Sequence, residues 1–308
     1  MRESGKMRRG FLILLAAGFC LSAGAMTFET DGAFLSLDEH NGAVEYLRGA
    51  DGVPRTVTAP EAFVLQLLDK AGNPVRLASH EFRYSAEGNE LSYAHPNGLR
   101  VRVRVRAAGG AFYFRPEVSG IPEGLLLEWF DGPQVLARSD TRLYWPYMDG
   151  AEVSNHAIRL GTPWEYRPLG RTPRYRSIGS LYPGWAQMQF IASYANGVGL
   201  YFAAVDPHHT PKAVEFTPVD GLRTRLSLQT FCGDLTDGAW RPDWEYVLKP
   251  YQGGWMEACA LYRDWIRTLP EFRNPPKRPA WMRESPVVLI YPVKGQGKDN
   301  ELEMQTNR

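Results

Sequence analysis

The sequence has no excess of charge of either sign, because 35 lysines and arginines stand against 34 aspartates and glutamates. A chain so nearly neutral lacks the electrostatic surface that binds nucleic acids or anionic membranes. One run of arginines at alternate positions is typical of a half-buried strand with a solvated face. The run consists of Arg100, Arg102, Arg104 and Arg106, with Leu99, Val101, Val103 and Val105 between them. We therefore predict no nucleic-acid partner.

Cysteine and the common catalytic motifs are equally scarce. Of three cysteines, Cys20 lies in the N-terminal leader, and Cys232 and Cys259 remain, so at most one disulfide can form. Whether these two pair is left open, since geometry decides it. No glycine-rich phosphate loop, GxSxG elbow or HExxH motif occurs, and Gly109-Gly110 reads as a hairpin turn. Nucleotide, serine-hydrolase and metalloprotease chemistry are disfavoured, and we predict no cofactor and no bound metal.

The first 25 residues have the order of a secretory signal peptide. A basic start precedes an apolar stretch from Phe11 to Leu21 and a small-residue site at Ala23-Gly24-Ala25. No later apolar run is long enough to cross a bilayer. We expect cleavage after Ala25 and export to the periplasm or the exterior of a bacterium; an uncleaved N-terminal anchor is the alternative.

Residues 26–250 consist mainly of short apolar runs separated by Gly, Pro, Asn and Asp. This spacing predicts a mainly β domain, a single large two-sheet sandwich rather than a βα repeat. The predicted strands are 28–37 and 44–47, joined through the turn Asn41-Gly42, and then 63–68, 80–84, 90–94, 100–107, 112–118, 125–130, 186–194, 198–204, 213–217 and 224–230.

The pattern changes after residue 250. Trp255, Cys259, Tyr262 and Ile266 fall at helical spacing, which predicts a linker helix within 251–273. A proline-rich connector follows at 274–285. The apolar run PVVLIY (286–291) is typical of a strand buried in a parallel sheet. We expect 286–308 to be the start of a truncated barrel domain.

This order of segments resembles bacterial glycoside-hydrolase-like proteins grouped as domain of unknown function 6259. The resemblance is carried by LYWPYMDG (143–150), YPGWAQMQFIASY (182–194), GVGLYFAAVDPHH (197–209) and WEYVLKPYQGGWMEACALYRDWI (244–266). It implies a galactose-mutarotase-like β-supersandwich followed by a (β/α)8 barrel. In related hydrolases the catalytic carboxylates stand on later barrel strands. No residue of this chain is therefore assigned a catalytic role, and the chain alone is expected to be inactive.

One group of candidate substrate-binding residues mixes aromatic rings with polar side chains in a stretch rich in Pro and Gly. Sugars stack their C–H faces on rings and need polar partners for their hydroxyls. The alternative is that the rings fill the core. The group comprises Trp145, Tyr147, Asp149, Tyr182, Trp185 and Gln187, with Tyr144, Glu152, Asn155 and Trp164 nearby.

Asp206, His208 and His209 form a second candidate binding group, directly after the predicted strand 198–204 and beside Pro207. They could hold a sugar hydroxyl or exchange a proton with it. The alternatives are a turn stabilised by its own hydrogen bonds, or a metal site, which the missing further ligands disfavour.

We expect a carbohydrate-binding, accessory domain of an exported glycoside hydrolase, with an oligo- or polysaccharide as partner. Two other functions stay open. A sugar 1-epimerase would need an acid/base group, for which His156, His208, His209 and Glu152 are the candidates. A free-standing carbohydrate-binding module would need none.

Overall fold

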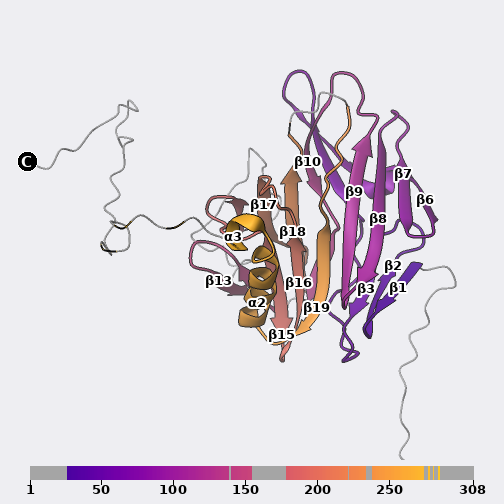
Figure 1. Cartoon of the computed structure of the whole chain (residues 1–308). Helices are drawn as coiled ribbons and strands as arrows, with labels where there is room; N and C mark the ends of the chain where they lie inside the picture. Colours follow the sequence, from indigo (N-terminus) through magenta and orange to yellow (C-terminus); the bar gives the residue numbers. More distant parts are fainter. Residues whose placement is uncertain are drawn as a thin grey trace, which may run out of the picture. The chain divides into compact units, whose positions relative to one another are not determined.

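The computed structural model describes residues 26–138, 140–154, 178–220, 222–233 and 238–273, with 277, 280 and 284. The chain divides into two compact units, residues 1–263 and 264–308. All the strands described belong to the first unit, where they form three antiparallel sheets (Figure 1). The predicted mainly β, two-sheet architecture is confirmed. The leader, Asn155, His156, Trp164 and the run 286–291 lie outside the described residues.

Two large sheets carry the fold, and a small third sheet stands beside them. The seven-stranded sheet has the order β14 (Ile178–Tyr182), β17 (Lys212–Pro218), β18 (Arg223–Phe231), β10 (Leu126–Asp131), β4 (Val64–Leu68) and β5 (Pro74–Ala78), and β11 (Val135–Arg138) also pairs with β18. The nine-stranded sheet has the order β13 (Ala151–Ser154), β12 (Arg142–Trp145), β15 (Phe190–Ala195), β16 (Val198–Ala204), β19 (Tyr246–Gln252), β9 (Ala111–Ser119), β8 (Arg100–Ala108), β7 (Glu90–Ala94) and β6 (Arg83–Glu87). The small sheet is β1 (Met26–Thr30), β2 (Ala33–Leu37) and β3 (Val44–Arg48).

The β8–β9 hairpin shows how the sequence sets the register. Along β8 the arginines are exposed while Val101, Val103 and Val105 are buried, as the alternation predicts. Ala108 pairs with Ala111, so Gly109 and Gly110 alone make the turn. Both have positive φ, 59° and 68°, a combination that the two-residue turn favours because its twist matches that of the strands. The valine face is thereby fixed toward the other large sheet.

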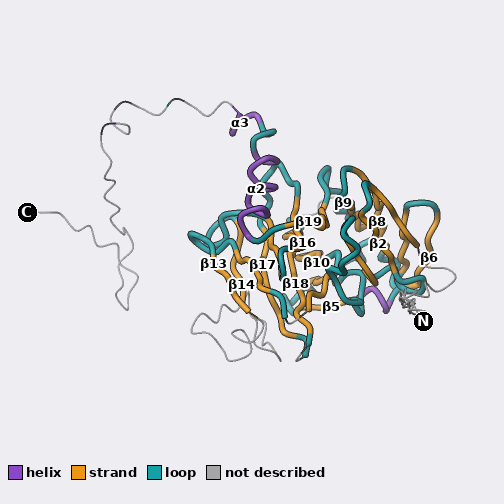
Figure 2. The backbone as a smooth tube through the Cα atoms, turned by 90° about the horizontal axis from the view of Figure 1, so that it is seen from below, coloured by secondary structure: helices purple, strands orange, loops and turns teal. Residues whose placement is uncertain are grey.

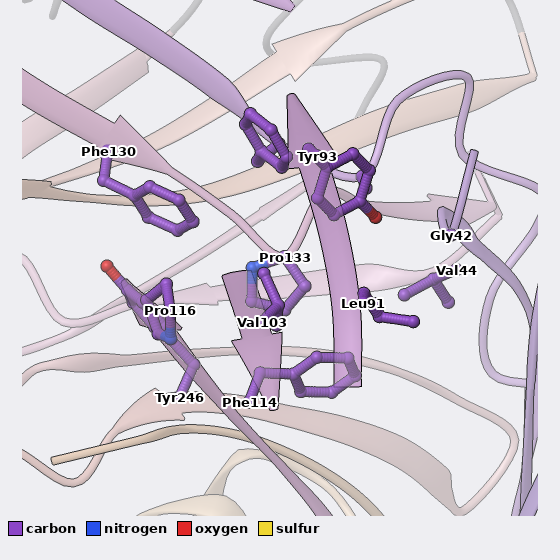
Figure 3. Close-up of a pocket in the computed structure, with 12 residues that line it drawn as sticks. Gly42, Val44, Leu91, Tyr93, Val103, Phe114, Pro116, Phe130, Pro133 and Tyr246 are labelled. Atoms are coloured by element: carbon purple, nitrogen blue, oxygen red, sulfur yellow. The ribbon is translucent and has the colours of Figure 1, made fainter. Parts of the chain in front are cut away.

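The core lies between the facing sides of the two large sheets. Phe130 of β10 comes from the seven-stranded sheet, and Tyr93 of β7 and Phe114 of β9 come from the nine-stranded sheet; they point into one small apolar space (Figure 3). Its volume is only about 20 Å³, room for a single water, and apolar cavities of this kind stay dry. This space belongs to the core, and a ligand site must be sought elsewhere.

Helix α2 (Trp255–Ile266) begins after the last strand and covers the outer side of the nine-stranded sheet. Tyr262 packs on Phe190, with ring centroids 5.2 Å apart, and Trp255 stacks on Tyr144 at 6.0 Å. Figure 2 shows β16 and β19 between α2 and β18. The Tyr144 ring is therefore part of the packing under this helix.

Helix α2 ends at Ile266, earlier than the predicted run, and Pro270 begins the short helix α3 (Pro270–Arg273). Proline suits that first helical position, since it has no N–H to leave unpaired. Cys232 and Cys259 are both free, so no disulfide joins them. No helix within the described ranges has the length and apolar character to cross a membrane.

The strand prediction was wrong in places. Residues 80–84 form the end of a short 3₁₀ helix, Ser79–Glu81, and the start of β6 rather than one strand, and 28–37 is the β1–β2 hairpin, turning at Asp31-Gly32. The short strands β5, β11, β12, β13 and β14 were missed, and so was the seven-residue strand β19 (Tyr246–Gln252). The five short strands have only four or five residues each and lie beside Pro and Gly, so their sequences show too few alternations to mark a strand. The consequence matters for the site, because Tyr144 and Trp145 lie in β12 and Tyr182 closes β14.

Candidate functional site

Three aromatic rings form a series from the core to the surface at the end of β12. Trp145 is buried, and its indole Nε1 donates a hydrogen bond to Ser180 Oγ at 2.8 Å. Its ring centroid lies 4.4 Å from that of Tyr147. Tyr147 in turn stacks on Trp185, with centroids 5.7 Å apart and planes 16° from parallel. We call Trp145, Tyr147 and Trp185 the ring series.

The two loops that carry the ring series are joined by backbone hydrogen bonds. Met148 N donates to Trp185 O at 2.8 Å, and Gln187 N donates to Pro146 O at 3.0 Å. Tyr147 and Ala186 form an isolated antiparallel bridge between them. A short ladder therefore holds the loops in register, so the outer ring has a fixed orientation without a ligand.

The outer end of the ring series faces solvent. Trp185 is 55% exposed and Met148 is 48% exposed, a rare condition for such large apolar side chains. Asp149 and Gln187 are also exposed and adjoin these two residues. Within the described part of the chain, neither of their side chains has a hydrogen-bond partner. This surface thus combines an exposed ring face with exposed polar side chains.

Trp145 and Tyr182, two of the predicted binding residues, lie behind this surface. Their side chains are only 4% and 5% exposed. The Tyr182 hydroxyl lies 2.5 Å from His209 Nδ1. Burial, followed by the nearby Tyr262, raises the pKa of Tyr182 well above its ordinary value, so the phenol stays protonated. Trp145 therefore supports the surface rings from behind, and Tyr182 contacts His209 instead.

Asp206 is the anchor of the turn that follows β16. Its carboxylate is wholly buried and accepts hydrogen bonds from the backbone N–H groups of His208 and Thr210, each at 2.8 Å. It also pairs with Lys212 Nζ, which is equally buried. A carboxylate so enclosed has no free path to a ligand, and its contacts explain the shape of the turn.

His208 and His209 contact different residues. His208 Nε2 lies 2.9 Å from Asp243 Oδ1 at the surface, whereas His209 faces Tyr182. The hydrogen bond that His208 donates to Asp243 raises the pKa of His208, and the same bond lowers the pKa of Asp243. No group of three or more His, Cys, Asp or Glu side chains gathers as a metal site in the described ranges.

Glu152, the carboxylate considered for an epimerase, is also engaged. It accepts a hydrogen bond from Arg142 Nη1 at 2.8 Å and another from the Tyr194 hydroxyl. The contact joins the neighbouring strands β13, β12 and β15. Glu152 therefore has a clear structural role at the edge of the nine-stranded sheet.

Four residues that shape this region were missed from the sequence: Ser180, Met148, Lys212 and Asp243. For Lys212 the sequence does give an indication. Lys212, Val214 and Phe216 lie at alternate positions of one strand and so on the same face, and both apolar residues are buried. A lysine on the apolar side of a strand calls for a buried acid. For Ser180, Met148 and Asp243 nothing in the local sequence marks the partner, which comes from a distant segment.

Comparison with known proteins identifies the fold. No protein-family model and no curated protein matches the chain. Among solved structures, α-N-acetylgalactosaminidase of Bifidobacterium bifidum in complex with GalNAc matches at a TM-score of 0.52 and 12% identity, over 79% of this chain and 38% of that chain. The chain thus spans well under half the length of that enzyme. At such identity the likeness shows the fold alone.

Two further matches have lower TM-scores. A GH36 α-galactosidase of Geobacillus stearothermophilus in complex with 1-deoxygalactonojirimycin matches at 0.47 and 13% identity, over 80% of this chain and 43% of that chain. An Escherichia coli K12 protein assigned as an aldose 1-epimerase matches at a TM-score of 0.46 and 13% identity, over 74% of this chain and 99% of that chain. These two scores are too low to define the type of sandwich, so the galactose-mutarotase-like type that the sequence resemblance implies stays a prediction. Domain of unknown function 6259 itself is matched by none of them and stays a prediction.

Proposed function

We propose that this chain binds carbohydrate through the ring series, as the accessory sandwich of an exported glycoside hydrolase. The observation that carries the proposal is the exposed Trp185 ring, stacked at its back on Tyr147 and held in place by the Met148–Trp185 backbone hydrogen bond. A sugar presents a flat C–H face that packs on such a ring. Since the ring is already oriented, binding loses little side-chain entropy.

The polar residues beside the ring suit the rest of a sugar. Hydroxyl groups need both donors and acceptors at fixed positions. Asp149 accepts hydrogen bonds, and Gln187 both accepts and donates them. The fold likeness to an α-N-acetylgalactosaminidase supports the ligand class, because that enzyme was solved with GalNAc. Galactosyl and N-acetylgalactosaminyl glycans are accordingly the first ligands to try.

The contacts of the candidate acid/base groups favour an accessory role over catalysis by the sandwich. An epimerase needs a group free to exchange protons with the sugar. Asp206 is enclosed by Lys212 and backbone N–H groups, and Glu152 bonds to Arg142. His208 is exposed beside Asp243 and His209 contacts Tyr182, so these two histidines are the groups that the next experiment tests. Glycosidases use two carboxylates about 5–10 Å apart, which we expect on another part of the enzyme.

Proton NMR of the full chain with reducing sugars separates the candidates. We expect saturable binding while the two anomers interconvert at the spontaneous rate. Interconversion clearly above that rate, proportional to protein concentration, would show that the sandwich is an epimerase and overturn the accessory role. A His209→Gln variant that abolished such interconversion would then identify the group responsible.

Export is part of the proposal. Cleavage after Ala25 leaves the described sandwich intact, because β1 begins at Met26. The intact mass of the protein recovered from outside the bacterial cytoplasm tests this. We expect the mass of a chain that begins at Met26. The mass of a chain that still contains residues 1–25 would contradict the proposed cleavage.

A further inference from the structure

A second cavity, of about 200 Å³, is lined by the part of β19 that extends beyond its neighbour β9. The last pair between β19 and β9 is Leu248 with Phe112, whereas β19 continues beside β16 as far as Gln252, opposite Val198. Residues 249–252 therefore have one strand edge without a partner strand. The cavity opens along that edge.

Two hairpin turns form the walls of the cavity. The β1–β2 turn contributes Asp31, and the β8–β9 turn contributes Gly110. Gly110 N donates to Thr30 Oγ1 at 3.4 Å, and a Cβ placed on Gly110 would lie 3.9 Å from the Cβ of Asp31. The walls thus belong to two different sheets that meet here.

A fixed guanidinium lies at the base of the cavity. The Arg55 side chain is almost wholly buried, and its Nε donates to Gly199 O at 3.0 Å. Further hydrogen bonds join it to Val53 O and to the Asp51 carboxylate. The Asp51 pKa is lowered despite its partial burial, because Arg55 and the Val53 N–H hold the charged form. This pair keeps the loop after β3 in a single arrangement.

Three side chains that line the cavity retain hydrogen-bonding atoms with no partner among the described residues. The Asp31 carboxylate and the Gln252 amide make no hydrogen bond there, and Lys249 Nζ uses one, to Gly109 O at 3.0 Å. A fourth such atom, the Tyr251 hydroxyl, is buried, and the remaining lining is apolar: Ala33, Ala50, Pro250 and the Tyr251 ring. Donors, acceptors and apolar surface therefore face one space.

We propose that this cavity is a second small-molecule site, and that it takes a single neutral, hydroxyl-rich unit such as a monosaccharide or a polyol. The two acids, Asp31 and Asp51, balance the two bases, Arg55 and Lys249, so no net charge favours an ion. The apolar residues suit C–H faces, and the Tyr251 hydroxyl with the polar groups of Asp31, Lys249 and Gln252 suits hydroxyls. The site is independent of the ring series, since Trp185 does not line it.

Titration of the full chain with neutral monosaccharides and polyols, followed by backbone amide NMR, tests this site. The amides of Gly110 and Gln252 should shift with a saturable dependence on ligand. Lys249→Met and Asp31→Asn should each weaken that binding about tenfold to a hundredfold, the loss expected for a charge-assisted hydrogen bond. Asn tolerates the positive φ of position 31, 47°, so Asp31→Asn should fold.

Matched controls make the outcome decisive. Lys70→Met makes the same chemical change at an exposed position outside the cavity and should bind like the wild type. Trp185→Ala should also leave this binding intact, which separates it from the ring series. The proposal is overturned if no neutral ligand shifts these amides at tens of millimolar. It is equally overturned if Lys249→Met and Asp31→Asn bind as the wild type does, or if a hexosamine or hexuronate binds in preference to the neutral sugars.

Discussion

Lys212 and Asp206 form an ion pair in which neither side chain is exposed to solvent. Lys212 Nζ also donates to Thr210 O at 2.9 Å and lies 4.7 Å from the ring centroid of Trp244. Burial lowers the pKa of Lys212, and the charge of Asp206 opposes that effect. This pair joins the first residue of β17 to the turn after β16, next to Tyr182.

Removing one partner of this pair should be costly. Lys212→Met leaves the Asp206 carboxylate buried without its cation, and we expect the free energy of unfolding to fall by about 3–5 kcal/mol. Urea denaturation measures it. The double variant Lys212→Met with Asp206→Asn should recover part of the loss, and the exposed Lys70→Met should change stability by less than about 0.5 kcal/mol. A Lys212→Met variant as stable as Lys70→Met would contradict the assignment.

His208 should titrate above its ordinary range. Asp243 stabilises the imidazolium, so the folded protein keeps the proton to a higher pH than the unfolded chain does. The stabilisation is therefore fully present below the ordinary pKa of 6.5 and is lost as the pH rises through the raised value. NMR titration of the His208 ring should show the raised pKa in the wild type and a value near 6.5 in Asp243→Asn. Equal values in the two proteins would disprove the pairing.

Trp145 and Trp185 should respond differently to truncation, although both belong to the ring series. Trp145 is buried and bonded to Ser180, so Trp145→Ala should lower the free energy of unfolding by about 3–5 kcal/mol. Trp185→Ala removes a ring that is more than half exposed, and the thermal midpoint should change little. For Trp145 the alternative given from the sequence, that the ring fills the core, is therefore the one that the burial favours. Comparable melting of the two variants would show that the burial assigned to Trp145 is wrong.

Where the sequence was informative, the reason was periodicity. The alternation in β8 reports directly which face is buried, and β7 alternates in the same way. β16 was also predicted to the residue, but as a continuous apolar run that is buried on both faces. The burial of Trp145 against the exposure of Trp185 was not predictable. Both stand beside Pro or Gly, and what separates them is the contact of Trp145 with Ser180 of β14, a long-range contact that local patterns do not encode.

For the candidate polar groups, too, the local sequence predicts the position in the chain but not the partner. That His208 and His209 follow a strand and enter a turn is evident in the sequence, but their partners Asp243 and Tyr182 come from segments about 30 residues away. The second cavity was not foreseen at all. It arises because β19 outruns β9, and strand length differences of this kind follow from the assembled sheet.

The central claim is that the exposed face of Trp185 binds a sugar, and calorimetric titration tests it most directly. Galactosyl and N-acetylgalactosaminyl glycans should bind the wild type, and Trp185→Ala should weaken binding by about 1–3 kcal/mol while its melting curve stays unchanged. Phe231→Ala, which removes another partly exposed ring on the seven-stranded sheet, should bind like the wild type. If Trp185→Ala binds every glycan as tightly as the wild type and Phe231→Ala do, the ring series is not the carbohydrate site.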